Sequence, residues 1–333
     1  MKPAPRASVI VPTFNGASRL RRCLDALLAQ RTGRQFEIIV VDDGSQDDST
    51  QVVQCYGQVR LLHQDHRGPA AARNLGVRSA RGEIVLFTDD DCVPEPDWLE
   101  QMLQPFSTPG VVGAKGVYRT AQKELIARFV QLEYEEKYAH MQGARWIDFV
   151  DTYSAAFERQ VFLEAGGYDE RFSTASTEDQ ELSFRLASAG HRMVFAPEAR
   201  VWHTHVDSLR GYLKKKHKIG YWKVYTLLKN PNKIAGDSHT PTTLKIQVLL
   251  AAAFLPGLAA VLCPWGWLLP VGIAAGFGLS TLPLWIRCMA ADPAVGALAP
   301  LFIACRAVGL TSGLCAGLLE FGAGALASRP ARL

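Results

Sequence analysis

The stretch Glu83-Ile84-Val85-Leu86-Phe87-Thr88-Asp89-Asp90-Asp91-Cys92-Val93-Pro94 joins a short apolar strand to three adjacent carboxylates. Carboxylates this close repel one another, which weakens a fold unless a cation sits among them. A hard divalent cation with oxygen ligands would relieve the repulsion, and Asp89 and Asp91 can converge on one ion where the chain turns. Taken alone, the run is also compatible with a solvated acidic loop.

Apolar strands alternate with helical patterns over the first ninety or so residues. Strands are predicted at 8–12, 36–41, 59–62 and 83–87, and helices at 18–30, 47–56 and 69–80. Such alternation gives right-handed crossovers between parallel strands. The sequence therefore predicts an α/β fold with a Rossmann-like, mostly parallel sheet.

Polar clusters follow three of the predicted strands. They are Pro12-Thr13-Phe14-Asn15, Asp42-Asp43-Gly44-Ser45 and Asp89-Asp90-Asp91. In open α/β sheets ligands bind beyond the carboxyl ends of the strands. Loop polarity would explain any one cluster, but three at successive strand ends predict a site on one rim of the sheet.

The second half of the soluble part is less regular and carries two further candidates. Thr177-Glu178-Asp179 precedes a helical pattern, where Thr177 can cap the helix and the acidic residues suit its N-terminal end. His203 and His205 stand at strand spacing in Val201-Trp202-His203-Thr204-His205. A histidine pair near a proposed metal site is a ligand candidate, although a lone histidine is more often structural.

The last ninety or so residues are almost free of charge and contain long apolar runs. Ile246 to Leu262 and Trp267 to Ile286 each approach the length of a membrane-spanning helix, and the short turn between them predicts a helical hairpin. Lys245 and Arg287 flank the hairpin, so both of its ends should face the cytosol. Ala294 to Phe321 is either a third span or a helix along the interface. We expect a span with Arg306 near the cytosolic side.

Composition narrows the class of protein further. The chain has 333 residues, formal net charge +4 and seven scattered cysteines without metal spacing, so no disulfide framework is expected. The apolar stretch within residues 1–12 is too short for a signal peptide, so the large domain should stay in the cytosol. A transporter is excluded because the soluble part is too large and the spans are too few.

Taken in order and spacing, these motifs resemble the family-2 glycosyltransferases with the A-type nucleotide-sugar fold. The resemblance covers roughly residues 7–230. It rests on the following short stretches: Ser8-Val9-Ile10-Val11-Pro12-Thr13-Phe14-Asn15, Val40-Val41-Asp42-Asp43-Gly44-Ser45, Arg73-Asn74, Asp89-Asp90-Asp91, Thr177-Glu178-Asp179 and Trp202-His203.

The resemblance implies a role for each matching residue. The donor would be bound by Pro12, Thr13, Asn15, Asp42, Asp43, Arg73, Asp89 and Asp90. Mg²⁺ or Mn²⁺ would be bound by Asp91, with Asp89 and with His203 or, alternatively, His205. Asp179 matches the catalytic base, with Glu178 beside it. The Gln-x-x-Arg-Trp signature of processive polymer synthases is absent, which favours transfer of a single sugar.

The resemblance and the apolar runs of the C-terminal part together predict how the chain is organised. We expect a cytosolic transferase domain at 1–235, with a nucleotide-binding half at 1–95 and an acceptor and catalytic half at 96–235. A membrane domain of two or three helices should follow at 244–322. The enzyme would be multi-pass in the cytoplasmic membrane and in contact with its lipids, where lysines and Arg306 could meet a lipid phosphate.

The expected reaction is inverting, metal-dependent transfer of one sugar from a nucleotide-diphosphate sugar to a hydroxyl or phosphate acceptor, lipid-linked acceptors included. No nucleic acid partner is expected. The rival enzyme class, a sugar nucleotidyltransferase, would need a glycine-rich phosphate loop where Pro12-Thr13-Phe14-Asn15-Gly16 stands. The other rival is a membrane scaffold that binds nucleotide-sugar without turnover.

Overall fold

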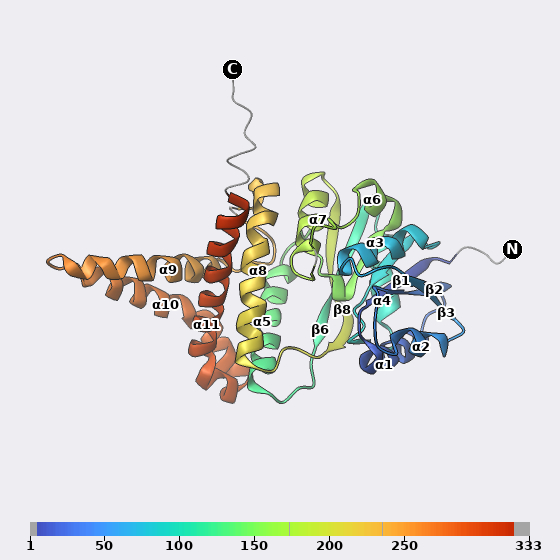
Figure 1. Ribbon diagram of the computed structural model, residues 1–333, viewed down its shortest axis with the longest axis horizontal. Coiled ribbons are helices and arrows are strands. Elements are labelled where there is room, and N and C mark those ends of the chain that lie inside the picture. The colour runs from blue at the N-terminus through green and yellow to red at the C-terminus, as the bar shows by residue number, and fades with distance from the viewer. Residues whose placement is uncertain (1–4, 173, 235, 323–333) are drawn as a thin grey trace, which may run out of the picture. The chain divides into compact units, whose positions relative to one another are not determined.

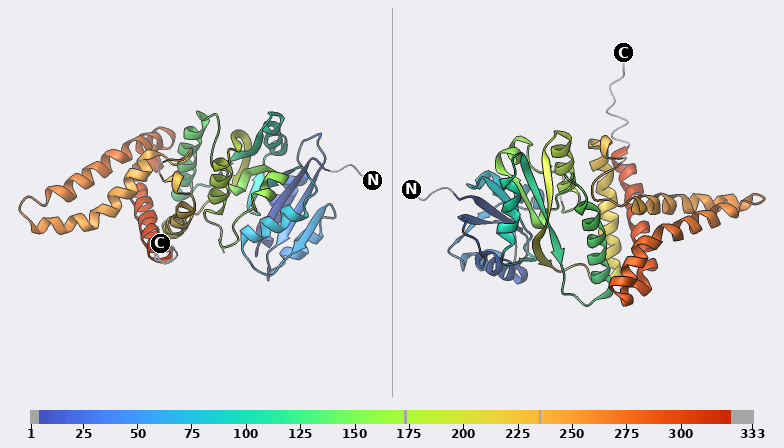
Figure 2. Two further views of the ribbon diagram at one scale, coloured as in Figure 1. Left: turned by 90° about the horizontal axis from the view of Figure 1, so that it is seen from above. Right: turned by 180° about the vertical axis from the view of Figure 1, so that it is seen from behind.

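The computed structural model describes residues 5–172, 174–234 and 236–322 (Figures 1 and 2). Residues 1–4, used above to argue against a signal peptide, and residue 235, at the expected domain boundary, lie outside the described residues. The strands found are β1 (Ala7–Thr13), β2 (Phe36–Asp42), β3 (Val59–His63), β4 (Ile84–Phe87), β5 (Cys92–Pro94), β6 (Val111–Arg119), β7 (Ala155–Glu158) and β8 (Arg192–His203).

These strands form one sheet in the order β3-β2-β1-β4-β7-β6-β8-β5. The pairs β3–β2, β2–β1 and β1–β4 are all parallel, and β6 is parallel to β8. The antiparallel pairs involve β7 and β5. The predicted mostly parallel α/β sheet is confirmed. The short strands β5 and β7 were not predicted.

Helices are found between the strands and throughout the apolar C-terminal part of the chain. They are α1 (Ala17–Leu28), α2 (Ser49–Gln54), α3 (Pro69–Ser79), α4 (Trp98–Leu103), α5 (Leu125–Gln142), α6 (Arg159–Glu164), α7 (Glu178–Ser188), α8 (Leu209–Lys229), α9 (Thr242–Leu258), α10 (Leu268–Ala291) and α11 (Pro293–Gly317). Helix α3 lies directly on β1, because a Cβ at Gly76 would stand 2.5 Å from a side-chain carbon of Ile10. This close approach fixes the segment that carries Arg73.

The register of β1 explains why the polar clusters gather at one rim. Thr13 pairs with Asp42, and Ile10 pairs with Phe87 just before the acidic triplet. Both faces of the strand are buried, as expected for a central parallel strand. The ends of β1, β2 and β4 therefore present their following residues to the same side.

The described chain divides into two compact units. Residues 5–121, 141–204 and 237–239 form the first, which contains the sheet. The second contains α5, α8 and the apolar helices α9 to α11. This differs from the division expected at residues 235 and 244. The reason is that α5 and α8 share a hydrophobic core with the apolar helices.

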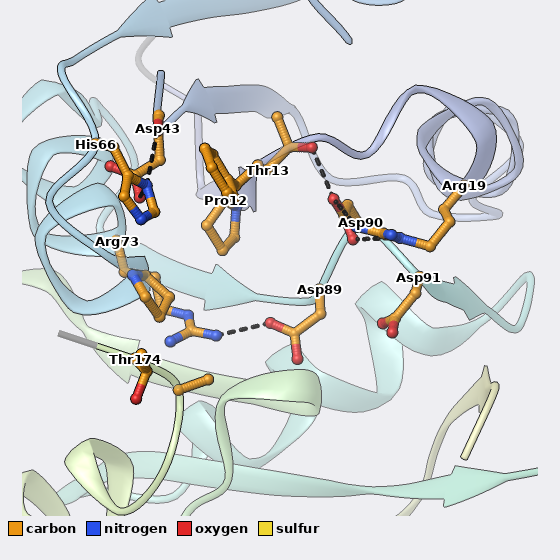
Figure 3. A pocket seen from close by; sticks show the side chains of 13 residues that line it. Pro12, Thr13, Arg19, Asp43, His66, Arg73, Asp89, Asp90, Asp91 and Thr174 are labelled. Atoms are coloured by element: carbon orange, nitrogen blue, oxygen red, sulfur yellow. Dashed lines mark hydrogen bonds and ion pairs between the residues drawn. The ribbon is translucent and has the colours of Figure 1, made fainter. Parts of the chain in front are cut away.

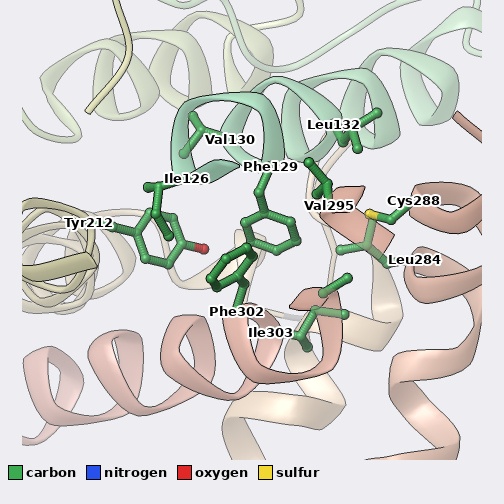
Figure 4. Packing of buried hydrophobic residues seen from close by; sticks show 11 residues of the cluster. Ile126, Phe129, Val130, Leu132, Tyr212, Leu284, Cys288, Val295, Phe302 and Ile303 are labelled. Carbon is green, nitrogen blue, oxygen red and sulfur yellow. The ribbon is translucent and has the colours of Figure 1, made fainter. Parts of the chain in front are cut away.

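That core joins aromatic and aliphatic side chains from four helices (Figure 4). Phe129 of α5 contacts Phe302 of α11 and Tyr212 of α8, with ring centroids 5.2 and 6.0 Å apart. Leu284 and Cys288 of α10 also belong to this core. The second unit is therefore held by burial shared among α5, α8, α10 and α11.

A buried polar network lies in the same unit. Arg306 of α11 donates from Nη1 to Glu133 Oε1 at 3.1 Å and from Nη2 to Gln247 Oε1 at 2.8 Å. Lys216 Nζ lies 2.9 Å from Glu133 Oε2. Burial raises the pKa of Glu133, but Lys216 and Arg306 outweigh it and lower that pKa to about 2. Since Arg306 is 1% exposed and paired, the expected contact between Arg306 and a lipid phosphate is not supported.

Three helical segments are long and apolar enough to cross a membrane by length and composition. They are Thr242–Leu262, Leu268–Ala291 and Pro293–Gly322. The first two match the predicted hairpin, and the turn at Cys263 to Trp267 lies between them. The prediction of C-terminal helices that are long and apolar enough to cross a membrane is therefore confirmed.

We predict that Arg306→Met destabilises the protein by about 2 kcal/mol or more, because Glu133 would lose one of its two cationic partners while remaining buried. Thermal unfolding in detergent measures the effect. Lys214→Met, which removes an exposed cation from the same unit, is the matched control and should change the stability by no more than about 0.5 kcal/mol. Equal effects of the two substitutions would contradict the assignment.

Candidate active site

The acidic triplet lies at one wall of a cleft of about 430 Å³ (Figure 3). The cleft lies within the first unit and its lining includes Pro12, Thr13, Phe14, Arg19, Asp43, His66, Pro69, Arg73, Asp89, Asp90, Asp91, Thr174 and Ala175. Asp89 and Asp91 point to one side of the chain and Asp90 to the other. The three carboxylates of the triplet therefore face two different sets of neighbouring residues.

Asp90 joins the triplet to β1 and α1. Its carboxylate accepts from Thr13 Oγ1 at 2.7 Å and from Arg19 Nε and Nη2, each at 3.1 Å. Burial raises the pKa of Asp90, and the hydrogen bonds from Arg19 and Thr13 oppose that rise. The contacts of Thr13 and Asp90, both expected to bind donor, therefore shape the wall of the cleft.

Arg73 connects the triplet to α7. Its Nη2 donates to Asp89 Oδ1 at 2.7 Å and its Nη1 donates to Glu178 Oε1 at 3.0 Å. The Arg73 and Glu178 side chains are each 2% exposed. Arg73 was expected to reach the donor directly, and here its guanidinium is committed to two carboxylates. The repulsion inferred from the triplet alone is thus relieved in part by Arg19 and Arg73.

The residues best suited to hold a divalent cation are Asp89, Asp91 and His203. One oxygen of each of these aspartates and Cys92 Sγ lie within 4.8 Å of one another, and His203 Nε2 lies 3.4 Å from Asp91 Oδ2. Burial, with the charges of Asp89 and Asp91, raises the pKa of the Cys92 thiol well above its usual value. Carboxylate oxygens with one imidazole form a donor set that fits Mg²⁺ or Mn²⁺.

Strand pairing decides which histidine joins this group. Cys92 of β5 is paired with His203 of β8, so His203 comes next to Asp91. His205 belongs to the second unit, where its Nε2 lies 3.0 Å from Gln131 Oε1 and its ring stacks on Tyr134. The structure brings His203, and not His205, to the acidic pair.

Asp43 and Asp42 follow β2 but face different surroundings. Asp43 lines the cleft and accepts from the backbone N–H groups of Arg67 and Gly68, each at 2.9 Å. Asp42 accepts from Ser45 N and Thr50 Oγ1, away from the cleft lining. Burial raises the pKa of Asp42, but hydrogen bonds, first that from Ser45, outweigh it and leave the pKa below its usual value.

Asn15, another expected donor ligand, secures the neighbouring loop. Its backbone N–H donates to Ser45 Oγ at 2.9 Å and its Oδ1 accepts from Gln46 N at 2.8 Å. Its φ of 49° lies in the left-handed region, which asparagine tolerates. Pro12, by contrast, lines the cleft as expected.

Phe14, His66 and Arg19 also line the cleft and were not singled out as site residues. The rings of Phe14 and His66 stack with centroids 4.0 Å apart, and His66 Nδ1 lies 2.9 Å from Asp43 Oδ2. The only sequence signal for His66 was its place in the loop after β3. Its contact with Phe14 is long-range and could not be read from spacing.

Asp179 stands next to Glu178 at the first turn of α7. It is half-buried, and Gln180 N donates to its Oδ1 at 2.7 Å. Burial raises the pKa of Asp179 well above its usual value, and the charges of Glu178 and Asp151 raise it further. Asp179 is not among the residues that line the cleft, but its neighbour Glu178 is hydrogen-bonded to Arg73, which lines it.

Lys115 and Asp151 form a buried ion pair that the sequence did not reveal. Lys115 lies on β6 and is 1% exposed. Its Nζ also lies 4.5 Å from the centre of the Phe149 ring. Because Asp151 is one of the charges acting on Asp179, this pair contributes to the electrostatic setting of the proposed base.

Residues 8–165 match the family model described as Glycosyl transferase family 2. The chain is 31% identical over 237 residues to the pre-mycofactocin glycosyltransferase of Mycobacterium tuberculosis, a match that spans 68% of this chain and about half (49%) of that protein. It is 28% identical over 296 residues to the glucosyl-dolichyl phosphate glucuronosyltransferase of Haloferax volcanii, covering 74% of this chain and 91% of that one.

Among solved structures, the fold is similar to that of the mannosyltransferase PcManGT from Pyrobaculum calidifontis, whose structure holds GDP-Man and Mn²⁺. The TM-score is 0.60 at 21% identity, with 96% of this chain and 87% of that chain covered. The likeness concerns the fold alone. The family match shows that residues 8–165 of this chain belong to a Glycosyl transferase family 2 domain, and the solved structure agrees with an A-type fold for it.

Proposed function

We propose that this enzyme transfers a single sugar from a nucleotide-diphosphate sugar to a hydroxyl or phosphate acceptor, with inversion and with a divalent metal ion. The observation that carries the proposal is the convergence of Asp89, Asp91 and His203 at a cleft that also holds Asp43. Arg73 links this cleft to the acidic start of α7.

The donor would lie in the cleft between Asp43 and the acidic triplet. Asp43 is held in place by two backbone N–H groups, which orients its carboxylate before the donor arrives. Pro12, Phe14 and His66 give one wall an apolar and aromatic character suited to a nucleoside base. The diphosphate would then extend toward Asp89 and Asp91.

Asp91 and His203, with Asp89, would hold Mg²⁺ or Mn²⁺ at this point. The relative from Pyrobaculum calidifontis was solved with Mn²⁺, which supports the assignment by analogy. When bound, the ion supplies a Lewis acid that offsets the negative charge on the leaving phosphate. Arg73 keeps Asp89 oriented by its hydrogen bond.

Asp179 would act as the base that takes the proton of the acceptor hydroxyl. A carboxylate whose pKa is raised is a stronger base once ionised, and it works closer to neutral pH. Glu178 is already paired with Arg73, so it is less able to take a proton. A single displacement with this base would invert the anomeric centre.

The acceptor is proposed to be met at the cytosolic face of the membrane, and lipid-linked acceptors are included. The apolar helices α9 to α11 support a membrane location. The name of the Haloferax volcanii relative specifies a dolichyl phosphate-linked substrate, which supports a lipid-linked acceptor by analogy. A panel of nucleotide sugars, assayed for metal-dependent release of nucleoside diphosphate with lipid and soluble acceptors, tests the proposal.

We predict that Asp179→Asn lowers the transfer rate about 10²–10⁴-fold, because the acceptor proton loses its base. Nucleoside diphosphate binding, measured by calorimetry, should be unchanged. Glu164→Gln, an exposed carboxylate on α6, is the control and should keep full activity. An active Asp179→Asn enzyme would remove Asp179 from this role.

The same assignment predicts a pH profile. Because the pKa of Asp179 is raised, its carboxyl group loses its proton and can act as a base only at a pH above the usual aspartate range. The rate of transfer should therefore climb with pH along a limb that is displaced upward from that range. A rate that is already constant from pH 4 upward, after control for protein stability, would contradict a raised pKa.

Metal dependence separates the two histidines. We predict that chelation abolishes transfer and that His203→Gln raises the Mn²⁺ concentration needed for half-maximal activity by about tenfold or more. His205→Gln, two residues away and hydrogen-bonded to Gln131, should leave that concentration unchanged. Equal shifts for both variants, or full activity in excess chelator, would refute the proposed metal site.

A further inference from the structure

Helix α11 is apolar enough to cross a membrane, yet it lies against α8 along its second half. Gly309, Gly313 and Gly317 face α8, and a Cβ at Gly313 would stand 1.9 Å from the carbonyl oxygen of His217. At Gly317 the corresponding distance to Tyr221 O is 2.4 Å. The two backbones therefore touch, as in helices packed through small residues every fourth position.

Helix α8 cannot lie in the hydrocarbon core, because it is rich in basic residues. Arg210 and Lys214 are exposed on it, one turn apart. Its other basic side chains are Lys215, Lys216, His217, Lys218, Lys223 and Lys229. Charged side chains at the centre of a bilayer are costly, so a helix bound backbone-to-backbone to α8 should share its depth.

The first half of α11 is attached to a second charged helix, α5. Arg128 of α5 donates from Nε to Asp292 Oδ2 at 2.7 Å, and Asp292 caps α11 by accepting from Val295 N. Further along, Arg306 is paired with Glu133 of α5. Within the described part of this unit, α11 therefore contacts a charged helix near its start through α5 and along its second half through α8.

The hairpin of α9 and α10 behaves differently. Only 11% and 17% of its apolar windows are buried within the protein, against 44% for α11. In all views the hairpin projects crosswise from α8 and α11, which run side by side (Figures 1 and 2). Its outer residues, such as Leu255 and Leu262, are 74% and 91% exposed.

We propose that only the α9–α10 hairpin enters the hydrocarbon core, and that α8 and α11 lie together in the membrane interface. The exposed apolar residues Leu301 and Val308 of α11 would contact acyl chains, while Arg210 and Lys214 of α8 contact anionic lipid headgroups. Trp222 and Tyr225 cluster around Phe321 at the far end of the pair, and such aromatic groups are typical of the interface.

The first test is the topology of the full chain. Fluorescent protein, which folds in the cytosol, and alkaline phosphatase, which is active only outside it, are fused in turn to each end of the chain in bacterial cells. With two spans, both ends report the same side of the membrane. Ends on opposite sides would show that α11 crosses, and would overturn the proposal.

The second test is the lipid that the protein retains. Arg210→Gln/Lys214→Gln should reduce the phosphatidylglycerol that co-purifies in neutral detergent about tenfold or more, since each basic group near an anionic surface contributes roughly a fivefold factor. Arg21→Gln/Arg22→Gln, two exposed residues of α1, is the control with the same change in charge. An unchanged amount, or an equal loss in the control, would overturn the assignment of α8 to the headgroups.

Discussion

The candidate site depends on the hydrogen bonds that the buried guanidinium of Arg73 donates to two carboxylates. This guanidinium joins Asp89 at the end of β4 to Glu178 at the start of α7. Without it, Asp89 and the buried Glu178 would both lose this cationic partner, which is costly for a buried carboxylate. The side chain of the next residue, Asn74, donates to the backbone oxygen of Tyr168 and accepts from the backbone N–H of the same residue. One turn of α3 therefore fixes both the acidic triplet and the loop before α7.

The acidic triplet is stable because its members turn in different directions. Asp90 faces Thr13 and Arg19, Asp89 faces Arg73, and Asp91 stands beside His203. The fold itself thus supplies cationic partners for two of the three carboxylates. The groups that remain to hold the proposed metal ion are the second oxygen of Asp89, the carboxylate of Asp91 and the imidazole of His203.

The sequence predicted what depends on local pattern and strand order. The apolar runs of β1, β2 and β4, and the polar residues that follow them, were sufficient to place Asp43 and the triplet on one rim. It could not predict contacts between distant segments. The pairing of β5 with β8 selects His203 over His205, and the pairing of Arg73 with Glu178 depends on packing between α3 and α7. Likewise, composition makes α11 a candidate span, whereas its glycine contacts with α8 appear only in the fold.

The most direct test is a crystal structure with Mn²⁺ and a nucleoside diphosphate, read by the anomalous signal of manganese. The account predicts a single strong peak within ligand distance of Asp91 and His203, with Arg73 still bonded to Asp89 and Glu178. A peak elsewhere, or an Arg73 side chain that has left both carboxylates for the diphosphate, would contradict it.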